Sequence, residues 1–419
     1  MKGCFGLRAW WLTASVVAAS GGLPASAMAA TTLPAHGHHQ HGHAHEAGST
    51  PQSLAERRRL LEAGEGSLVA GDIEGARRAF EQAANMAHSA EIELGILRTQ
   101  MQAGEYRQAL AFAAHTAGVH LDDVEGAAFY AWLLNLGAQV TVADQVLQQA
   151  ERRVPAHPLL REVRHRLRTD MPLASGALLA LPVRLAPWPT GELVSQQAKV
   201  AACAFLLTDG RHALAPRVAI PSTGMIWLRN GLGQTVSARP VKLEGAAQGQ
   251  AADADALGLV MLELAQPLPA AGGDIVPPRD AFPGSPAFVM DYLLDSAGQP
   301  AWPLMRAGFL GSPLPAEKAG PTWAARRLGV TLPAPGSPRG GPVYDQGGRL
   351  VGLALGGRSV AGADGVDQAD RLIPISILRG HFGDRFGVST PEPRPTPIGA
   401  DELYERAMRT SLQVLVSAP

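Results

Sequence analysis

The chain has 419 residues and a formal net charge of −1 at neutral pH, so its overall charge favours neither nucleic acid nor an anionic membrane as a partner. This length suffices for two or three domains. Most of its 47 glycines and 33 prolines lie beyond residue 170, which predicts many short strands joined by turns in that part of the chain.

Residues 1–29 have the three parts of a secretory signal peptide. Lys2 and Arg8 form a charged start, residues 9–20 are apolar, and residues 25–29 offer small side chains for cleavage. The apolar run is too short to span a membrane, and no later segment is long and apolar enough to do so. We therefore expect an exported protein of the bacterial periplasm or the extracellular space, without a transmembrane segment after signal cleavage.

Residues 30–52 form a low-complexity linker that holds six of the 13 histidines. These six are His36, His38, His39, His41, His43 and His45. Imidazoles on a glycine-rich chain bind Zn²⁺, Ni²⁺ or Cu²⁺, and the composition favours a flexible linker that takes up such ions adventitiously. We expect no required cofactor, and no ligand-spaced cluster among the seven histidines outside this tract.

Residues 53–170 are expected to form helical repeats. Gly71, Gly104 and Gly137 are spaced by 33 residues each, and small alanines follow them where two helices approach closely. This pattern resembles tetratricopeptide repeats. The resemblance implies a short solenoid whose concave side binds a protein or peptide partner. The basic residues of 159–168 are interpreted as the solvated face of a closing helix rather than as a nucleic-acid patch.

Residues 175–388 are predicted to form two six-stranded antiparallel barrels or barrel-like sheets. The candidate strands of the first are 200–208, 211–217, 225–229, 235–243 and 257–264. Those of the second are 287–293, 301–309, 322–331, 341–344, 350–355 and 371–375. Prolines 277, 278 and 283 mark the linker between the barrels. Cys203, in an apolar run, is interpreted as a small buried hydrophobe.

Two neighbouring motifs carry the fold assignment. Gly-Gly-Pro at 340–342, followed by Gly-Arg-Leu-Val-Gly-Leu at 348–353, resembles the segment after the nucleophile in trypsin-like serine proteases of the HtrA/Do type. The resemblance covers residues 195–380 and implies a two-barrel trypsin-like fold. Arg339 holds the position of the serine nucleophile, and its guanidinium has no lone pair to attack a carbonyl.

The other two catalytic positions are also replaced. The run 205–218 resembles the segment that ends at the catalytic histidine, and it places Arg217 there. The run 258–264 resembles the strand that starts at the catalytic aspartate, and it places Gly258 there. A triad needs a nucleophile, a base and a carboxylate that orients the base. The resemblance therefore implies a protease fold without a protease mechanism.

A displaced triad is the alternative interpretation. Ser337, His212, and Asp253 or Asp255 lie near the vacated positions in the sequence. Pro338 restricts Ser337 and fixes its own φ, which suits an oxyanion hole poorly.

Residues 389–419 are expected to hold a proline-rich extended tether over 389–397 and a last helix over 400–414 that docks on a barrel. The whole chain then favours an exported scaffold or adaptor. It would bind a protein or peptide through the repeats and, second, through the former catalytic cleft. The alternatives are a periplasmic serine protease with a displaced triad, and a metal-handling protein that uses the histidine tract.

Overall fold

The computed structural model describes residues 50–169, 173, 175–241, 257–269, 274–292, 298–313, 326–328, 340–355, 371–389 and 396–417. The predicted signal peptide and the histidine tract lie outside these residues. Gly48 to Pro419 belong to one compact unit. Within the described part of the chain, no helix combines the length and apolar content that crossing a membrane requires.

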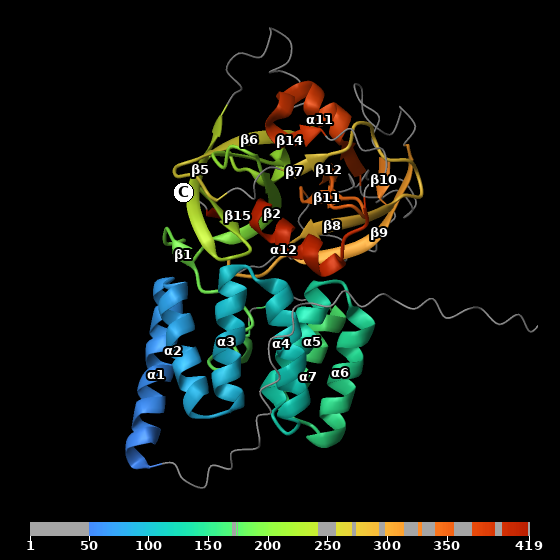
Figure 1. Cartoon of the computed structure of the whole chain (residues 1–419). Helices are drawn as coiled ribbons and strands as arrows, with labels where there is room; N and C mark the ends of the chain where they lie inside the picture. The colour runs from blue at the N-terminus through green and yellow to red at the C-terminus, as the bar shows by residue number, and fades with distance from the viewer. Residues whose placement is uncertain are drawn as a thin grey trace, which may run out of the picture. The chain divides into compact units, whose positions relative to one another are not determined.

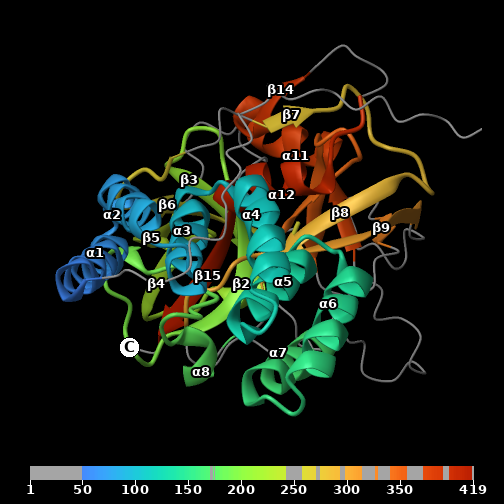
Figure 2. The same cartoon turned by 60° about the horizontal axis from the view of Figure 1, so that its bottom comes forward.

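Seven helices form the first part of the unit (Figures 1 and 2). They are α1 (Pro51–Ala70), α2 (Ile73–Met86), α3 (Ala90–Ala103), α4 (Tyr106–Val119), α5 (Val124–Leu136), α6 (Val140–Arg153) and α7 (Pro158–Thr169). Each packs against the next, which confirms the predicted helical first half. α1 and α3 end at two of the turn glycines, Gly71 and Gly104, which take left-handed φ values of 76° and 79°. At the third turn the left-handed residue is Ala138, directly after Gly137.

Two glycines set how closely the first three helices pack. A Cβ on Gly64 of α1 would lie 2.7 Å from the ring of Phe80, and a Cβ on Gly95 of α3 would lie 2.3 Å from it. Phe80, which comes from α2, therefore fills the space between α1 and α3. Any larger residue at either glycine would displace this ring from a close-packed core.

The first helices of the pairs form the inner row of the stack. α1 contacts α3, α3 contacts α5 and α5 contacts α7, whereas the second helices of successive pairs contact one another less. A helical stack curves toward the side on which its helices lie closest. The row of α1, α3, α5 and α7 therefore faces the concave side, where such arrays present their binding surface.

The chain's own linker covers part of this concave side. The backbone N–H of Trp188 donates to Oε1 of Gln102 in α3, at 2.9 Å. The Arg184 guanidinium lies 3.6 Å from the centroid of the Trp188 ring. Burial, and then the charge of Arg98 in α3, lower the pKa of Arg184 to about 10. Part of the side that the sequence assigns to a partner thus carries the chain's own linker, whose residues 183–187 are buried.

The first barrel contains the five predicted strands and one from the end of the chain. In order they are β5 (Gln234–Val241), β4 (Met225–Asn230), β15 (Ser411–Ser417), β2 (Lys199–Leu206), β3 (His212–Pro216) and β6 (Leu259–Leu264). β5 also pairs with β6, which closes the ring. The short β1 (Thr190–Gly191) adds to β5 in parallel.

The second barrel is closed by the six strands predicted for it. In order they are β10 (Arg326–Leu328), β13 (Arg371–Pro374), β12 (Leu350–Leu355), β11 (Pro342–Tyr344), β8 (Pro286–Asp291) and β9 (Leu304–Pro313). The fold class is therefore confirmed as a helical half followed by an antiparallel double barrel. The prediction missed β1, helix α11 (Ile375–Phe382) and a parallel pair of β7 (Asp274–Val276) with β14 (Gly387–Ser389).

The end of the chain also differs from the prediction. The helix expected over 400–414 stops as α12 (Ala400–Thr410), and the chain continues as β15. β15 is paired on both edges, with β2 and with β4, and nearly all of its side chains are buried. The apolar residues of β15 have a spacing that also fits a helix. Its strand partners lie far earlier in the sequence, so the local pattern alone does not reveal the pairing.

β15 stands where the second barrel has its first strand. In that barrel β8 lies between β9 and β11, which are the second and fourth strands in sequence. In the first barrel the position between β2 and β4 belongs to β15. The two barrels thus have the same order of neighbours, with one strand of the first supplied by the end of the chain.

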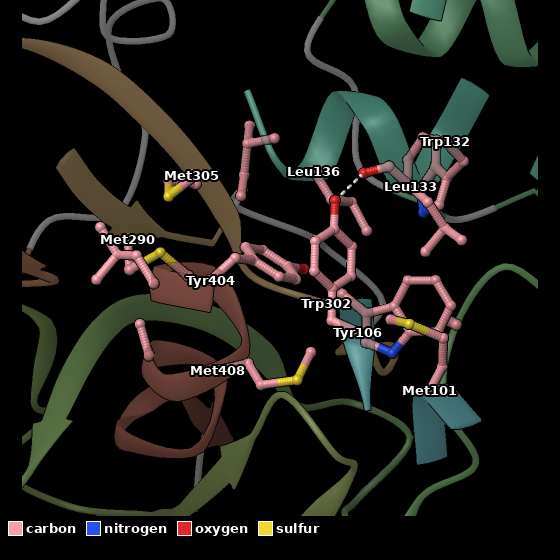
Figure 3. Close-up of a cluster of buried hydrophobic side chains, with 14 of the residues drawn as sticks. Met101, Tyr106, Trp132, Leu133, Leu136, Met290, Trp302, Met305, Tyr404 and Met408 are labelled. Carbon is pink, nitrogen blue, oxygen red and sulfur yellow. Dashed lines mark hydrogen bonds between the residues drawn. The ribbon is translucent and has the colours of Figure 1, made fainter. Parts of the chain in front are cut away.

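Helices and barrels share one hydrophobic core next to α12 (Figure 3). Tyr106 at the start of α4 packs on Tyr404 of α12, with ring centroids 4.3 Å apart. The Tyr106 hydroxyl donates to the carbonyl oxygen of Leu133 at 2.7 Å, and the Tyr404 hydroxyl donates to that of Pro303 at 2.8 Å. Both buried phenols are therefore satisfied, so this contact holds the helical half on the barrels without an unpaired polar group.

We expect Leu412→Ala in β15 to lower the free energy of unfolding by about 2–5 kcal/mol, because it leaves a cavity in a core strand. Leu412 is 0% exposed, whereas Leu193, which is 94% exposed, offers the matched control. Leu193→Ala should change stability by less than about 0.5 kcal/mol. Urea unfolding followed by circular dichroism measures both, and equal effects would contradict the placement of β15 inside the barrel.

Candidate functional site

Two of the three residues that the sequence motifs align with a catalytic triad lie side by side. Arg217 starts the 3₁₀ turn η1 (Arg217–Ala219) directly after β3, and its backbone N–H donates to the carbonyl oxygen of Gly258 at 2.8 Å. Gly258 directly precedes β6 and has a φ of 74°. The register of β3 with β6, which pairs Pro216 with Leu259, brings these two residues together.

The segment that follows the third position packs against the first. A Cβ on Gly340, whose φ is 119°, would lie 2.2 Å from the carbonyl oxygen of Cys203 and 2.4 Å from Cδ of Pro216. Gly340 therefore rests on the residue that precedes Arg217, and only glycine fits there. Arg339 itself lies outside the described residues, as do Ser337, Asp253 and Asp255.

The chemistry available at this point differs from that of a triad. The Arg217 side chain is exposed, and its Nη1 donates to the carbonyl oxygen of Ile220 at 3.4 Å. A guanidinium stays protonated in proteins, so it cannot accept a proton from a nucleophile. Gly258 has no side chain with which to orient a base. The geometry offers a fixed positive charge beside an open backbone position, which suits binding of an anionic group.

His212, the base of the displaced-triad interpretation, lies at the other end of β3. Its Nδ1 is 2.7 Å from Oδ2 of Asp209. Burial raises the pKa of Asp209, but hydrogen bonds from His212 and from the backbone N–H groups of Arg211 and His212 outweigh it and hold that pKa below its usual value. His212 thus has a carboxylate partner. Four residue steps along the strand, about 13 Å, separate it from Pro216.

Cys203 lies at the seam between the barrels. It is 0% exposed, and its Sγ is 3.9 Å from the carbonyl oxygen of Met290 in β8. Burial, and then the charge of Asp291, raise the pKa of the Cys203 thiol well above its ordinary value. The thiol therefore stays protonated and out of reach of solvent, which leaves it a packing role.

The structure corrects the expectation that the other histidines form no cluster. His88, His115 and His120 surround Glu93 of α3. His88 precedes α3 and His120 follows α4, so they occupy equivalent loops of successive repeats. They are 32 residues apart, close to the 33-residue spacing of the turn glycines. That near-match is the sequence signal that could have revealed the cluster.

No protein-family model matches the chain, and no curated protein does. Among solved structures, the chain is similar to the apo form of the MamO protease domain from Magnetospirillum magneticum, with 17% identity, a TM-score of 0.33, and 45% of this chain and 92% of that one covered. It is also similar to the inactive form of the Rv3671c protease, with 12% identity, a TM-score of 0.32, and 45% and 87% covered. The active form of Rv3671c from M. tuberculosis is similar as well, with 11% identity, a TM-score of 0.31, and 48% of this chain and 83% of that one covered. Similarities of this size carry no argument about activity.

We expect a fluorophosphonate probe to leave the purified protein unlabelled, because the positions of base and carboxylate hold Arg217 and Gly258. In-gel fluorescence against an active trypsin-like protease measures this. Arg339→Ser alone should not restore labelling, since a lone serine lacks its base. Stoichiometric labelling mapped to Ser337 would establish the displaced triad instead.

We expect Cys203 to resist iodoacetamide in the folded protein at pH 8 and to react once guanidinium unfolds the chain, because only the unfolded thiol reaches solvent and ionises. The raised pKa of the folded thiol also predicts the direction in which stability changes with pH. Above about pH 8.5 the unfolded thiol ionises while the folded one does not, so stability falls as the pH rises. Mass spectrometry of alkylation measures the first effect, and rapid modification of the native protein would contradict it.

Proposed function

We propose that the protein is an exported binding scaffold in which helical repeats support a catalytically inactive trypsin-like double barrel. The contact between the Arg217 N–H and the Gly258 carbonyl carries this proposal. It brings together Arg217 and Gly258, the two residues that the sequence motifs align with the base and the carboxylate of a triad. A guanidinium does not accept the nucleophile's proton, and glycine does not orient an imidazole. The signal-like residues 1–29 support export.

The partner surface that we propose is the rim of the former cleft at η1. Arg217 is exposed there, and the neighbouring Val218 is 96% exposed. The concave side of the repeats, in contrast, already holds residues 183–188 through Gln102 and Trp188. A cation next to an exposed apolar side chain suits a partner segment in which a carboxylate adjoins an apolar residue. The partner is therefore a protein or peptide with an acidic contact segment.

A photo-crosslinking amino acid at position 218 tests this surface in the living bacterium. We expect it to capture a partner protein, while the same group at position 193 captures none at that level. The control is matched because Leu193 is 94% exposed and Val218 is 96% exposed. Equal capture from both positions, or none from 218, would place the interface elsewhere.

The affinity of the captured partner then tests the charge. Arg217→Ala should weaken binding by at least about ten-fold, the size expected for a charge-assisted hydrogen bond. Arg211→Ala is the control, since Arg211 is also exposed and lies at the other end of β3. Surface plasmon resonance with the full chain measures both. Unchanged affinity for Arg217→Ala would remove the cleft rim from the interface.

A further inference from the structure

Three imidazoles converge on one buried carboxylate in the helical half. Glu93 lies in the first turn of α3, at the opposite end from Gln102, and its side chain is 5% exposed. Its Oε1 lies 2.5 Å from Nε2 of His88, and 3.6 Å from Nε2 of both His115 and His120. The four side chains come from the start of α3, the end of α4 and the loops beside them.

Two polar atoms of this cluster lack a hydrogen-bond partner among the described residues. They are Oε2 of Glu93 and Nε2 of His120, and both are buried. A buried carboxylate is costly unless a cation or donors compensate it. The unpartnered atoms therefore indicate that a cation belongs between them.

Protonated histidines account for this cation less well than a metal ion does. The rings of His88 and His120 have centroids only 4.8 Å apart and are tilted by 37°. Two imidazolium groups at that distance repel each other, which disfavours charging both. A metal ion binds both rings in their neutral form and supplies the positive charge that Glu93 requires.

We propose that Glu93, His88, His120 and His115 form a binding site for one divalent transition-metal ion of the Zn²⁺ class. One ring nitrogen from each of His88 and His120 and a carboxylate oxygen of Glu93 lie within 4.8 Å of one another. Bonds of about 2.0–2.2 Å place tetrahedral ligands about 3.3–3.6 Å apart. The separations of 3.6 Å from Glu93 to His115 and to His120 already match.

His88 must move away from the carboxylate to share an ion with it. Its Nε2 is hydrogen-bonding distance from the carboxylate, so it has to retreat by about 1 Å to share an ion with Glu93. Its side chain is 58% exposed, which leaves space for that shift. His115, which is 50% exposed and stacks on Phe112, supplies the fourth ligand from α4.

The donor set decides the class of ion. Three imidazole nitrogens with one carboxylate suit Zn²⁺, Ni²⁺ or Co²⁺, whereas Ca²⁺ and Mg²⁺ require mainly oxygen ligands. Bound metal would tie the loop before α3 to the end of α4. The site therefore fastens the two helices of the α3–α4 pair to each other, at the edge that faces away from the Gln102 end of α3.

The test uses the full chain with its six tract histidines changed to serine, so that the tract does not compete for metal. Zn²⁺ is titrated in competition with a chromophoric chelator, and Co²⁺ serves as a spectroscopic probe. We expect one Zn²⁺ per chain, visible d–d bands typical of tetrahedral Co²⁺, and a higher melting temperature with Zn²⁺ than with chelator.

Variants then assign the ligands. Glu93→Gln and His120→Ala should each weaken Zn²⁺ binding by at least about ten-fold and remove the melting shift. His88→Ala should also weaken Zn²⁺ binding. This variant should fold normally, because the side chain that it removes is largely exposed. His165→Ala, an exposed histidine of α7, is the control and should bind as before.

Three results would overturn the proposal. The first is no Zn²⁺ bound at one equivalent. The second is equal affinity in His88→Ala and His165→Ala. The third is a melting temperature that depends on pH through these residues but not on Zn²⁺ or chelator, which would assign the cluster to ion pairs with protonated histidines.

Discussion

The closure of the first barrel by β15 is the constraint on which the rest of the structure depends. Without residues 411–417, β2 and β4 would each present an unpaired edge, and the ring of six strands would stay open. α12 runs directly into β15, and its apolar face places Tyr404 on Tyr106 of the helical half. One segment of chain therefore closes a barrel and fixes the repeats to it, so these two features form together.

A second close contact joins the two barrels next to Arg217. Gly340 rests on Cys203 and Pro216, and a Cβ on Gly341 would lie 1.8 Å from the carbonyl oxygen of Met290. The two barrels meet here with no space for side chains, which fixes the backbone around Arg217. Backbone contacts and close packing therefore position Arg217, Gly258 and Gly340 relative to one another.

Much of this architecture was predictable because it rests on local patterns. The Gly-Gly-Pro motif, the other motifs that resemble trypsin-like proteases, and the Gly- and Pro-rich turns beyond residue 170 located the strands of both barrels. β15 was not predictable in the same way, since apolar residues at 412 and 416 fit a helix as well as a strand. Only its distant partners decide between the two. The Glu93 cluster was missed for a similar reason, because its residues are spread over 33 positions of the sequence and meet only when α3 packs on α4.

A contact within the chain covers part of the concave side of the repeats. A short array of this kind would normally offer that side to a partner, but here Trp188 and Gln102 exchange a hydrogen bond across it and Arg184 is buried beside them. A partner that used the concave side would have to displace a segment whose two ends are tied to α7 and to the first barrel. Such displacement would cost the burial of five consecutive linker residues, 183–187. The linker therefore leaves less of the concave side accessible to another molecule.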